Sequence, residues 1–388
     1  TKALFPHTFD TGIEHGTITV LLDHEGFEVT TYRVDGKYED SRHPKEVIFV
    51  RNLQEDLLRR DFTINAMAYN EKEGLVDIFG GMDDLKAGII RCVGNAQARF
   101  SEDALRILRG IRFAAQLGFE LEDETREGMR LLAPTLRKIS AERIQVELVK
   151  TLTSSRPDLL REAWKLGITK EFLPEFDLAM ETTQETVHHM YTVGEHILHT
   201  LLEVRPDRIL RLTMLLHDIG KPYMKTMDAD GVAHFKGHPE KSSELANEIL
   251  HRLKFDNDTI RKVTKLVRYH DHRMPVTPAH VRRAVHEIGE DLFPLYLEVR
   301  RADVAAQSMY QHKEKGADID GVEKLYHEIM ERKECVSLKM LAVTGKDLIA
   351  AGMKPGKEIG QMLEHFLDLV LEHPELNQKE ELLKRIEL

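Results

Sequence analysis

An acid and three arginines recur at every third position of one stretch of the chain, as Asp103, Arg106, Arg109 and Arg112. If this stretch is helical, the Asp103 acceptor lies about one turn from the guanidinium donors of Arg106. Cytosine and adenine each present an amino donor beside a ring-nitrogen acceptor, whereas uracil and guanine present a carbonyl oxygen beside a ring N–H. The pair is therefore predicted to read a nucleobase and to refuse uracil and guanine, because mismatched buried polar groups cost roughly 1–3 kcal/mol each. The alternative is a solvated helix face with ion pairs.

Two further motifs precede this row. Residues 59–66 read Arg-Arg-Asp-Phe-Thr-Ile-Asn-Ala, and residues 77–85 contain Gly80-Gly81. In this order and spacing, the three blocks resemble the class II tRNA nucleotidyltransferase and poly(A) polymerase family, in particular bacterial CCA-adding enzymes, over essentially the whole chain. The resemblance implies addition of C, C and A from CTP and ATP to the 3′ end of tRNA, with release of pyrophosphate. It implies nucleotide contacts by Arg60, Asp61, Asn65, Asp103, Arg106, Arg109 and Arg112.

Some of these residues also have plain structural readings. Asp61 is expected to cap a helix over residues 64–69, where aspartate is favoured in any case. Gly80-Gly81 resembles the hinge between the family's head and neck, although by composition it is only a turn.

The resembled family transfers nucleotides with two Mg²⁺ ions that three carboxylates hold. The resemblance makes Glu28, on a predicted strand, the third of these carboxylates; without it, Glu28 reads equally well as an outward-facing strand residue. The other two carboxylates form an Asp-x-Asp element after a Gly-Gly turn, upstream of the segment that the first residues resemble. We therefore expect an N-terminally truncated chain that does not add nucleotides by itself.

A second set of chemistry-bearing residues follows in the order His, His-Asp, His, His, Asp. This order resembles the HD phosphohydrolase superfamily. The resemblance implies a first metal ion on His196, His217, Asp218 and Asp303, and a second on His238 and His270. Imidazole and carboxylate suit Mn, Fe, Ni or Mg, and a bound divalent ion can generate hydroxide for attack on a phosphoester. A lone buried histidine is more often structural.

Several functions stay open beside CCA addition. One is addition of only CC, only A, or a poly(A) tail. Another is HD-type hydrolysis of nucleotides or of cyclic phosphates at RNA ends. A third is RNA binding without catalysis.

Composition limits the class of protein. A chain of 388 residues is long enough for more than one compact unit. The net charge of −11 means that RNA contacts must come from local basic patches, such as Arg282-Arg283 with Arg300-Arg301. No apolar run reaches eighteen residues, so no membrane partner is expected. The cysteines, Cys92 and Cys335, lack metal-type spacing and indicate a reducing cytoplasm.

The elements that must position these residues are mostly helical. Strands are predicted over residues 17–22 and 27–34 with a turn at 23–26, and strand signals end near residue 95. Helices are predicted over residues 104–117, ending at Gly118, and over 141–152, with Ser140 as N-cap and Arg143 as a brace to the preceding domain.

The predicted fold class is α+β, mostly α. A residual polymerase-β-like nucleotidyltransferase head covers residues 1–90 and a nucleobase-reading neck covers 91–155. An HD-type helical body covers residues 156–310 and a helical tail covers 311–388. Gly-rich turns at residues 345–360 resemble the family's tRNA-binding tail, although ordinary helix punctuation explains them as well.

Overall fold

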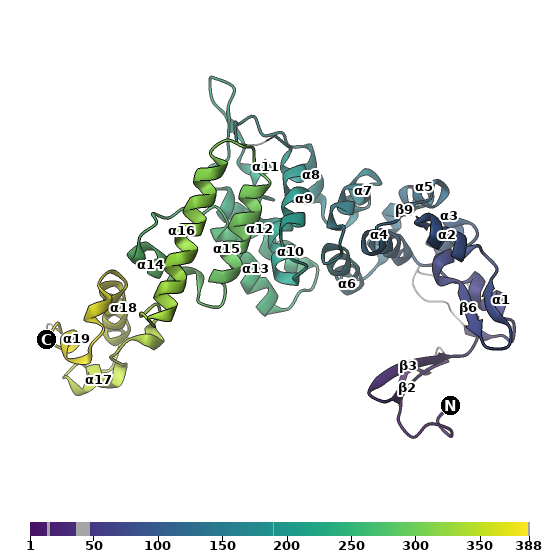
Figure 1. The fold of residues 1–388 in the computed structure, drawn as a ribbon, viewed down its shortest axis with the longest axis horizontal. Coiled ribbons are helices and arrows are strands. Elements are labelled where there is room, and N and C mark those ends of the chain that lie inside the picture. Colours follow the sequence, from purple (N-terminus) through teal and green to yellow (C-terminus); the bar gives the residue numbers. More distant parts are fainter. Residues whose placement is uncertain (14–15, 36–46, 189, 387–388) are drawn as a thin grey trace. The chain divides into compact units, whose positions relative to one another are not determined.

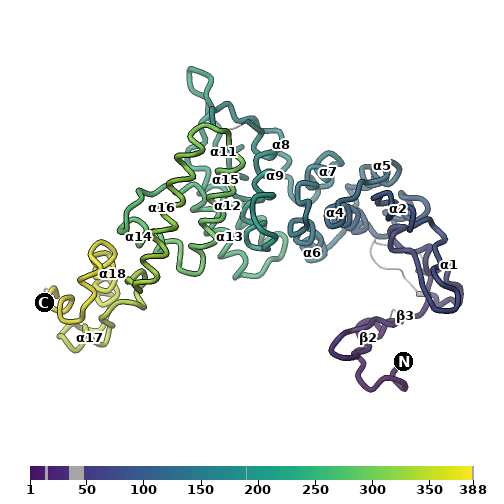
Figure 2. The backbone as a smooth tube through the Cα atoms, in the orientation of Figure 1, coloured from purple at the N-terminus to yellow at the C-terminus, as the bar shows by residue number. Residues whose placement is uncertain are grey.

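The computed structural model describes residues 1–13, 16–35, 47–188 and 190–386. These residues form two compact units. Figure 1 shows the chain as a ribbon, and Figure 2 shows its backbone as a tube in the same view. The first unit contains Thr1–Asp177 with Arg252–Phe255, and the second contains Leu178–His251 with Asp256–Leu388. In the part of the chain that is described, none of the helices combines the length and the apolar character needed to cross a bilayer.

The first unit opens with an antiparallel sheet of three strands, β1 (Thr8–Gly12), β2 (Thr17–Leu22) and β3 (Glu25–Thr30), in that spatial order. Asp23 and His24 alone form the turn between β2 and β3, at φ values of 47° and 70°. The turn is therefore tighter than predicted, because Glu25 already pairs with Leu22. The second predicted strand is also divided, since β3 ends at Thr30.

Short strands and helices complete the first unit. They are β4 (Arg33–Asp35), β5 (Val47–Phe49), α1 (Leu53–Leu58), β6 (Met67–Asn70), β7 (Gly74–Asp77), α2 (Gly81–Ala87), β8 (Ile89–Ile90), α3 (Ala96–Glu102), α4 (Leu105–Leu117), β9 (Glu120–Leu121), α5 (Asp123–Leu132), α6 (Ala141–Leu152) and α7 (Leu160–Lys165). Helix α8 (Pro174–Glu181) spans the boundary between the units. The two helices most relevant to the site, α4 and α6, pack against each other.

Helix α4 forms where the apolar pattern predicted it. Ile107, Leu108 and Ile111 are buried on it, and Gly118 ends it in the left-handed region at a φ of 70°. Helix α6 also has its predicted bounds, although the side chain of Ser140 donates or accepts no capping hydrogen bond. Burial of the apolar faces of these helices decides their position, as expected for amphipathic helices.

The second unit is almost wholly helical. Its elements are α9 (Val193–Glu203), α10 (Arg208–Leu216), α11 (Lys221–Met224), β10 (Thr226–Met227), β11 (Ala233–His234), α12 (His238–Arg252), α13 (Asn257–Tyr269), α14 (Pro278–Ile288), α15 (Phe293–Ala305), α16 (His312–Glu331), α17 (Gly345–Ala350), α18 (Lys357–Glu372) and α19 (Lys379–Leu383). Helices α14, α15 and α16, labelled in Figure 1, pack on one another. Phe293, Tyr296 and Tyr326 belong to the hydrophobic core that they share. The prediction that strands stop near residue 95 is wrong for β9, β10 and β11, which are two residues long each.

The basic patch predicted at Arg282-Arg283 with Arg300-Arg301 is wrong for two of its members, because Arg282 and Arg300 are buried, whereas the side chains of Arg283 and Arg301 are partly exposed. The Arg282 guanidinium donates to the Leu371 carbonyl at 2.7 Å and pairs with Glu334 at 2.7 Å, and so ties α14 to α18. The Arg300 guanidinium donates to the His270 carbonyl at 3.0 Å. Both side chains therefore serve the interior of the unit.

The tail around α17 shows ordinary helix punctuation. Thr344 and Asp347 form a capping box at the start of α17, so their side chains already satisfy backbone N–H groups there. RNA contacts by this segment stay a prediction.

Candidate active sites

The row that begins at Asp103 does not lie on a single helix. Helix α3 ends at Glu102 and α4 begins at Leu105, and Asp103 between them is extended, with φ −137° and ψ 104°. The prediction of one continuous helical row is therefore wrong for its first member. The break has a local cause, because the Asp103 carboxylate accepts the backbone N–H of Leu105 at 3.0 Å, as a helix-capping side chain does. Aspartate competes with helical backbone in this way.

Arg106 is built into the framework around the break. Its guanidinium pairs with Glu102 at 2.6 Å and donates to the carbonyls of Arg99 at 3.0 Å and Arg59 at 2.8 Å. The last contact joins α4 to the Arg59-Arg60-Asp61 motif, 47 positions earlier. Arg106 is buried, so these contacts hold its planar fork in one orientation.

The two remaining arginines of the row each meet a carboxylate. Arg109 pairs with Asp61 at 2.6 Å and so connects the row to the second motif. Arg112 pairs with Glu147 of α6 at 2.6 Å, and its guanidinium lies 3.9 Å from the centre of the Phe113 ring. The Arg109 side chain is 37% exposed and that of Arg112 only 10%, so Arg109 is the more accessible of the two to a phosphate.

The second motif folds as a turn. Residues 64–69 were predicted to be a helix, but Thr63–Asn65 form a single 3₁₀ turn and Met67–Asn70 form a strand that pairs with β7. The helix prediction is wrong because the pairing of β6 with β7 outweighs the local pattern. Asp61 still fixes the turn, since its carboxylate accepts the N–H of Phe62 at 2.9 Å and the amide of Asn65 at 3.4 Å.

Arg60 and Gly81 flank this turn. Arg60 is partly exposed and pairs with Asp56 at 3.4 Å, so its guanidinium remains within reach of solvent. Gly81 has a packing reason to be glycine, because a Cβ there would lie 2.3 Å from the Thr63 carbonyl oxygen. Gly80 has a φ of 74° and precedes α2, whose first N–H groups Asp77 accepts.

Glu28 lies on β3 opposite Thr19, with an exposed side chain. Among the described residues, it does not belong to any group of three ligand-bearing side chains. These residues alone therefore do not build the Mg²⁺ site that the resemblance implies, and the role of Glu28 stays a prediction.

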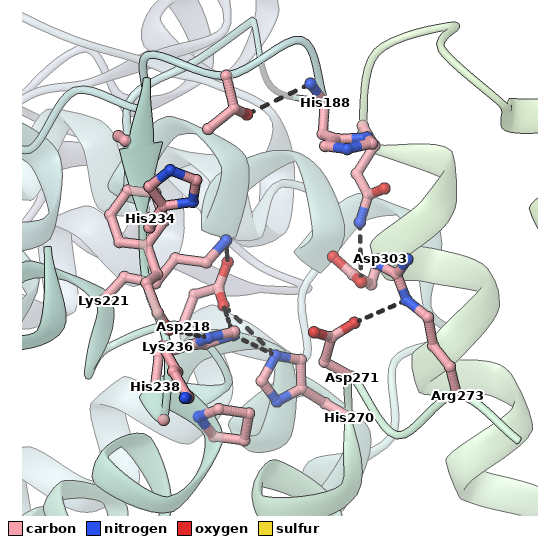
Figure 3. Close-up of a pocket in the computed structure, with 16 residues that line it drawn as sticks. His188, Asp218, Lys221, His234, Lys236, His238, His270, Asp271, Arg273 and Asp303 are labelled. Carbon is pink, nitrogen blue, oxygen red and sulfur yellow. Dashed lines mark hydrogen bonds and ion pairs between the residues drawn. The ribbon is translucent and has the colours of Figure 1, made fainter. Parts of the chain in front are cut away.

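The histidines and aspartates of the second set do converge. His196 comes from α9, His217 and Asp218 directly follow α10, His238 opens α12, His270 directly follows α13, and Asp303 comes from α15. We call these six residues the His–Asp centre; all of them are buried. Figure 3 shows Asp218, His238, His270 and Asp303 around the pocket that they line.

The ligand atoms fall into two adjacent groups. In the first, the Nε2 of His196 lies 3.0 Å from Asp303 and 3.3 Å from the Nε2 of His217. In the second, the Nε2 atoms of His238 and His270 lie 3.2 Å apart, and each is 3.4 Å from one Asp218 oxygen. The other Asp218 oxygen lies 3.3 Å from His217, so Asp218 joins the two groups.

Every imidazole of the centre is oriented by its other nitrogen. The Nδ1 atoms face backbone carbonyls: that of His217 lies 2.8 Å from Met214, that of His238 2.9 Å from Phe235, that of His270 2.7 Å from Val267 and that of His196 3.3 Å from Ala306. A carbonyl can only accept, so each Nδ1 carries the proton and each Nε2 presents a lone pair to the centre. A carbonyl contact at the nitrogen that faces away from the metal is typical of metal-ligating histidines.

The charge states suit a cation. Burial by itself raises the pKa of Asp218, but Lys221 and His217 outweigh it and hold this pKa well below its usual value. Burial lowers the pKa of His270, which favours the neutral ligand. Burial also opposes protonation of His217, yet Asp218 and Asp303 raise its pKa. These two carboxylates therefore attract a positive charge at the point where a metal ion would replace that proton.

The pocket over the centre has a volume of about 450 Å³. Basic side chains line it together with the ligands: Lys221, Lys236 and Arg273. Lys221 was missed by the sequence reasoning; its ammonium contacts Asp218 at 2.7 Å and Gln184 at 3.0 Å. The available signal was its spacing, three residues after Asp218 at the first turn of α11. A basic pocket beside converging ligands suits an anionic substrate such as a phosphoester.

Comparison with known proteins gives the family. The Poly A polymerase head domain matches residues 1–91, and the probable RNA- and SrmB-binding site of polymerase A matches residues 118–180. The HD domain matches residues 186–284, and the putative tRNA nucleotidyltransferase domain 2 matches residues 238–386. The CCA-adding enzyme of Pediococcus pentosaceus is 35% identical over 99% of this chain and 85% of its own length.

The chain belongs to the CCA-adding enzyme family. The CCA-adding enzyme of Limosilactobacillus reuteri is 33% identical over 100% of this chain and 84% of its own length. The crystal structure of the Bacillus stearothermophilus CCA-adding enzyme in complex with CTP is 26% identical, with a TM-score of 0.66, over 96% of this chain and 80% of that one. The nucleotidyltransferase family, the HD domain and the α+β, mostly α class predicted from the motifs are confirmed.

Proposed function

We propose that this chain recognises CTP and ATP for addition to the 3′ end of tRNA, and that Asp103 and Arg106 read the incoming base. Membership of the CCA-adding family carries this proposal, together with the relative that was crystallised with CTP. In the proposed contact, the Asp103 carboxylate accepts the amino N–H of cytosine or adenine, and a guanidinium N–H of Arg106 donates to the ring nitrogen. A uracil or guanine would direct its carbonyl oxygen at the carboxylate, and the two acceptors would repel each other.

The remaining contacts follow from accessibility. Arg109 and Arg60 are partly exposed guanidinium groups near Asp61, so they suit the triphosphate. Asp61 and Asn65 offer hydrogen bonds to the ribose. Arg112 is buried against Glu147, and a phosphate contact would require this pair to open. Glu28 is the proposed carboxylate ligand of Mg²⁺.

Nucleotide binding by this chain tests the base-reading step. Dissociation constants for CTP, ATP, UTP and GTP are measured with the intact chain and with Asp103→Asn. We expect the intact chain to prefer CTP and ATP, and we expect Asp103→Asn to lose this preference because its amide can also donate to a carbonyl. Asp83→Asn, at a side chain that is 89% exposed, is the matched control and should behave as the intact chain. An unchanged preference in Asp103→Asn would contradict the proposal.

The His–Asp centre supports a second function, metal-dependent hydrolysis of a phosphoester. The six ligands would hold one or two divalent ions, of which Mn, Fe, Ni and Mg fit the imidazole and carboxylate set. A bound ion would supply an ionised water at neutral pH. The chain's own residues would orient the substrate: Lys221, Lys236 and Arg273 line the pocket and would neutralise the phosphate.

Phosphate release tests this second function. The chain is loaded with Mn²⁺, Ni²⁺ or Mg²⁺ in turn and incubated with nucleoside monophosphates and 2′,3′-cyclic nucleotides. We expect metal-dependent turnover of at least one substrate, lost in His270→Ala. Absence of turnover with every metal, while metal is bound at the centre, would contradict hydrolysis and leave the centre a structural metal site.

A further inference from the structure

The Asp103 carboxylate is held at two points by residues outside the proposed base contact. One oxygen accepts the N–H of Leu105 at 3.0 Å. The other accepts the Nη2 of Arg143 at 2.9 Å, and the Nη1 of Arg143 lies 3.5 Å from the first oxygen. The guanidinium therefore faces the carboxylate end-on, through its two terminal nitrogens. Arg143 is 40 positions away along the chain, on the first turn of α6.

Helix α6 contacts both ends of the row, at Asp103 and at Arg112. Arg143 and Glu147 lie one turn apart on α6, and they pair with Asp103 and Arg112 respectively. The two pairs have opposite polarity. In the first, the cation Arg143 lies on α6 and the anion Asp103 in the row; in the second, the anion Glu147 lies on α6 and the cation Arg112 in the row. A slip of α6 by one turn would bring like charges together, so the pairs specify one alignment of α6 on α4.

From this geometry, we propose that Arg143 is a positioning residue for base selection: it fixes the orientation of the Asp103 carboxylate. The inference rests on the proposed role of Asp103 in reading the base. An ionised carboxylate offers about four acceptor directions, so the N–H of Leu105 and the fork of Arg143 leave others for the substrate. With both oxygens anchored, the remaining directions are set before the nucleotide arrives.

Orientation matters here because Asp103 lies outside both helices. Its backbone is extended, and its side chain is 19% exposed, so water is available to a carboxylate that turns away. Without Arg143, the carboxylate can rotate, and a water molecule can then pair with the carbonyl of a wrong base. Discrimination between bases depends on the direction of these oxygens, whereas contacts to the triphosphate come from other residues. Loss of Arg143 is therefore expected to reduce selectivity more than affinity.

If the contact between Arg143 and Asp103 instead blocks the base site, the predicted effect of removing Arg143 is the opposite. If Arg143 occupied the place of the base amino group, the incoming nucleotide would have to displace it. Removal of Arg143 would then tighten CTP binding and leave the preference over UTP intact. The two roles are thus separated by the ratio of two dissociation constants, which a merely structural role would not change.

The experiment measures the dissociation constants of CTP and UTP for the full chain and for Arg143→Met and Arg143→Lys. We expect the UTP to CTP ratio to fall about tenfold or more in Arg143→Met, the change produced by losing one oriented hydrogen bond. Arg143→Lys, which keeps one charged donor, should restore part of the ratio. Arg130→Met is the matched control, since Arg130 is exposed and pairs with Glu127 on its own helix; its ratio should equal that of the intact chain.

Thermal unfolding, followed by circular dichroism, shows whether each variant is folded at the assay temperature. If Arg143→Met is not, the ratio of the folded Arg143→Lys variant decides, and a value equal to the intact chain overturns the inference. An unchanged ratio in folded Arg143→Met, with or without tighter CTP binding, also overturns it. Asp103→Asn distinguishes the two levels: if that variant keeps its preference, the proposed function itself has failed; if it loses the preference and Arg143→Met does not, only the positioning role has failed.

Discussion

The row from Asp103 to Arg112 and the His–Asp centre both gather charged side chains, but they satisfy them in opposite ways. In the row, each charge faces an opposite charge: Asp103 faces Arg143, Arg109 faces Asp61 and Arg112 faces Glu147. In the centre, four imidazoles have their Nδ1 atoms turned to backbone carbonyls and their Nε2 atoms turned toward one another.

This difference separates two kinds of binding site. In the proposed function, the accessible Arg109 turns from Asp61 to the triphosphate, while the buried pair of Arg112 with Glu147 holds the framework. Lone pairs that converge in the centre repel one another, and a proton or a metal ion among them relieves this repulsion. This contrast agrees with the two proposed functions, in which the row binds a nucleotide that comes and goes and the centre holds a resident ion.

The largest expected effect follows from removing a ligand of the centre. His217→Ala takes away an Nε2 donor that lies beside both His196 and Asp218. We expect the metal content of the purified chain, measured by inductively coupled plasma mass spectrometry, to fall to background for the first ion. His251→Ala, at an exposed histidine of α12, should keep the metal content of the intact chain. Metal retained in His217→Ala would show that the convergence has another purpose.

Asp218→Asn is expected to destabilise the fold as well. Asp218 is buried, and Lys221 beside it would be left as a buried cation without its 2.7 Å partner. Breaking a buried pair by removing one member typically costs about 3–5 kcal/mol in free energy of unfolding. Urea denaturation of metal-free protein measures this cost, and Asp258→Asn, an exposed side chain with its own cationic partners, is the control. A loss of unfolding free energy no larger than that of the control would mean that water reaches Lys221 and stabilises its charge without Asp218.

The second largest effect belongs to the buried pair of the row. Glu147→Gln removes the carboxylate that faces the buried Arg112 guanidinium in the α4–α6 interface. Arg112→Met removes the guanidinium that faces the buried Glu147 carboxylate. We expect each single variant to lose about 3 kcal/mol or more of unfolding free energy, and the double variant to lose much less than the sum. A double-mutant cycle in urea measures the coupling. If the losses of unfolding free energy in the two single variants simply add, Arg112 and Glu147 are not coupled, and their pair does not hold α6 on α4.

The sequence predicts much of the fold around the row and the residues of the His–Asp centre. The apolar spacing over residues 104–117 and the Gly118 stop predict α4, and the order of histidines and aspartates predicts the side chains that the fold gathers at the His–Asp centre. Local signals fail where distant residues decide. Residues 64–69 form a turn and a strand because β7 pairs with β6, and Asp103 leaves the helix because it caps Leu105 and meets Arg143. The sequence alone does not single out Lys221, because its three-residue spacing from Asp218 brings the two side chains together only once α11 is known to begin at Lys221.

A moderate effect is expected at the accessible pair of the row. Arg109 is 37% exposed, so solvent screens its contact with Asp61 and the pair contributes about 0–1 kcal/mol to stability. Arg109→Met should therefore unfold nearly as the intact chain does, yet bind CTP about tenfold more weakly if its guanidinium contacts phosphate. Isothermal titration calorimetry measures the affinity, with Arg130→Met as control. Normal CTP affinity would remove Arg109 from the proposed triphosphate contacts and would place the row closer to a structural element.

The smallest effect is expected at Lys221, where the two regions resemble each other. Its ammonium lies 2.7 Å from the Asp218 oxygen that is also 3.3 Å from His217, pairs with it as an ion pair does in the row, and would also repel a bound cation. Lys221→Met removes that repulsion, so we expect Mn²⁺ affinity to rise, by no more than about tenfold because protein relaxation screens the charge. Hydrolysis should fall in the same variant, since one of the proposed phosphate contacts is lost. Arg261→Met, at an exposed arginine paired with Asp258, is the control for a lost positive charge on this unit. Weaker Mn²⁺ binding in Lys221→Met would show that the ammonium mainly orients Asp218 as a ligand, and the centre would then depend on an ion pair in the same way as the row.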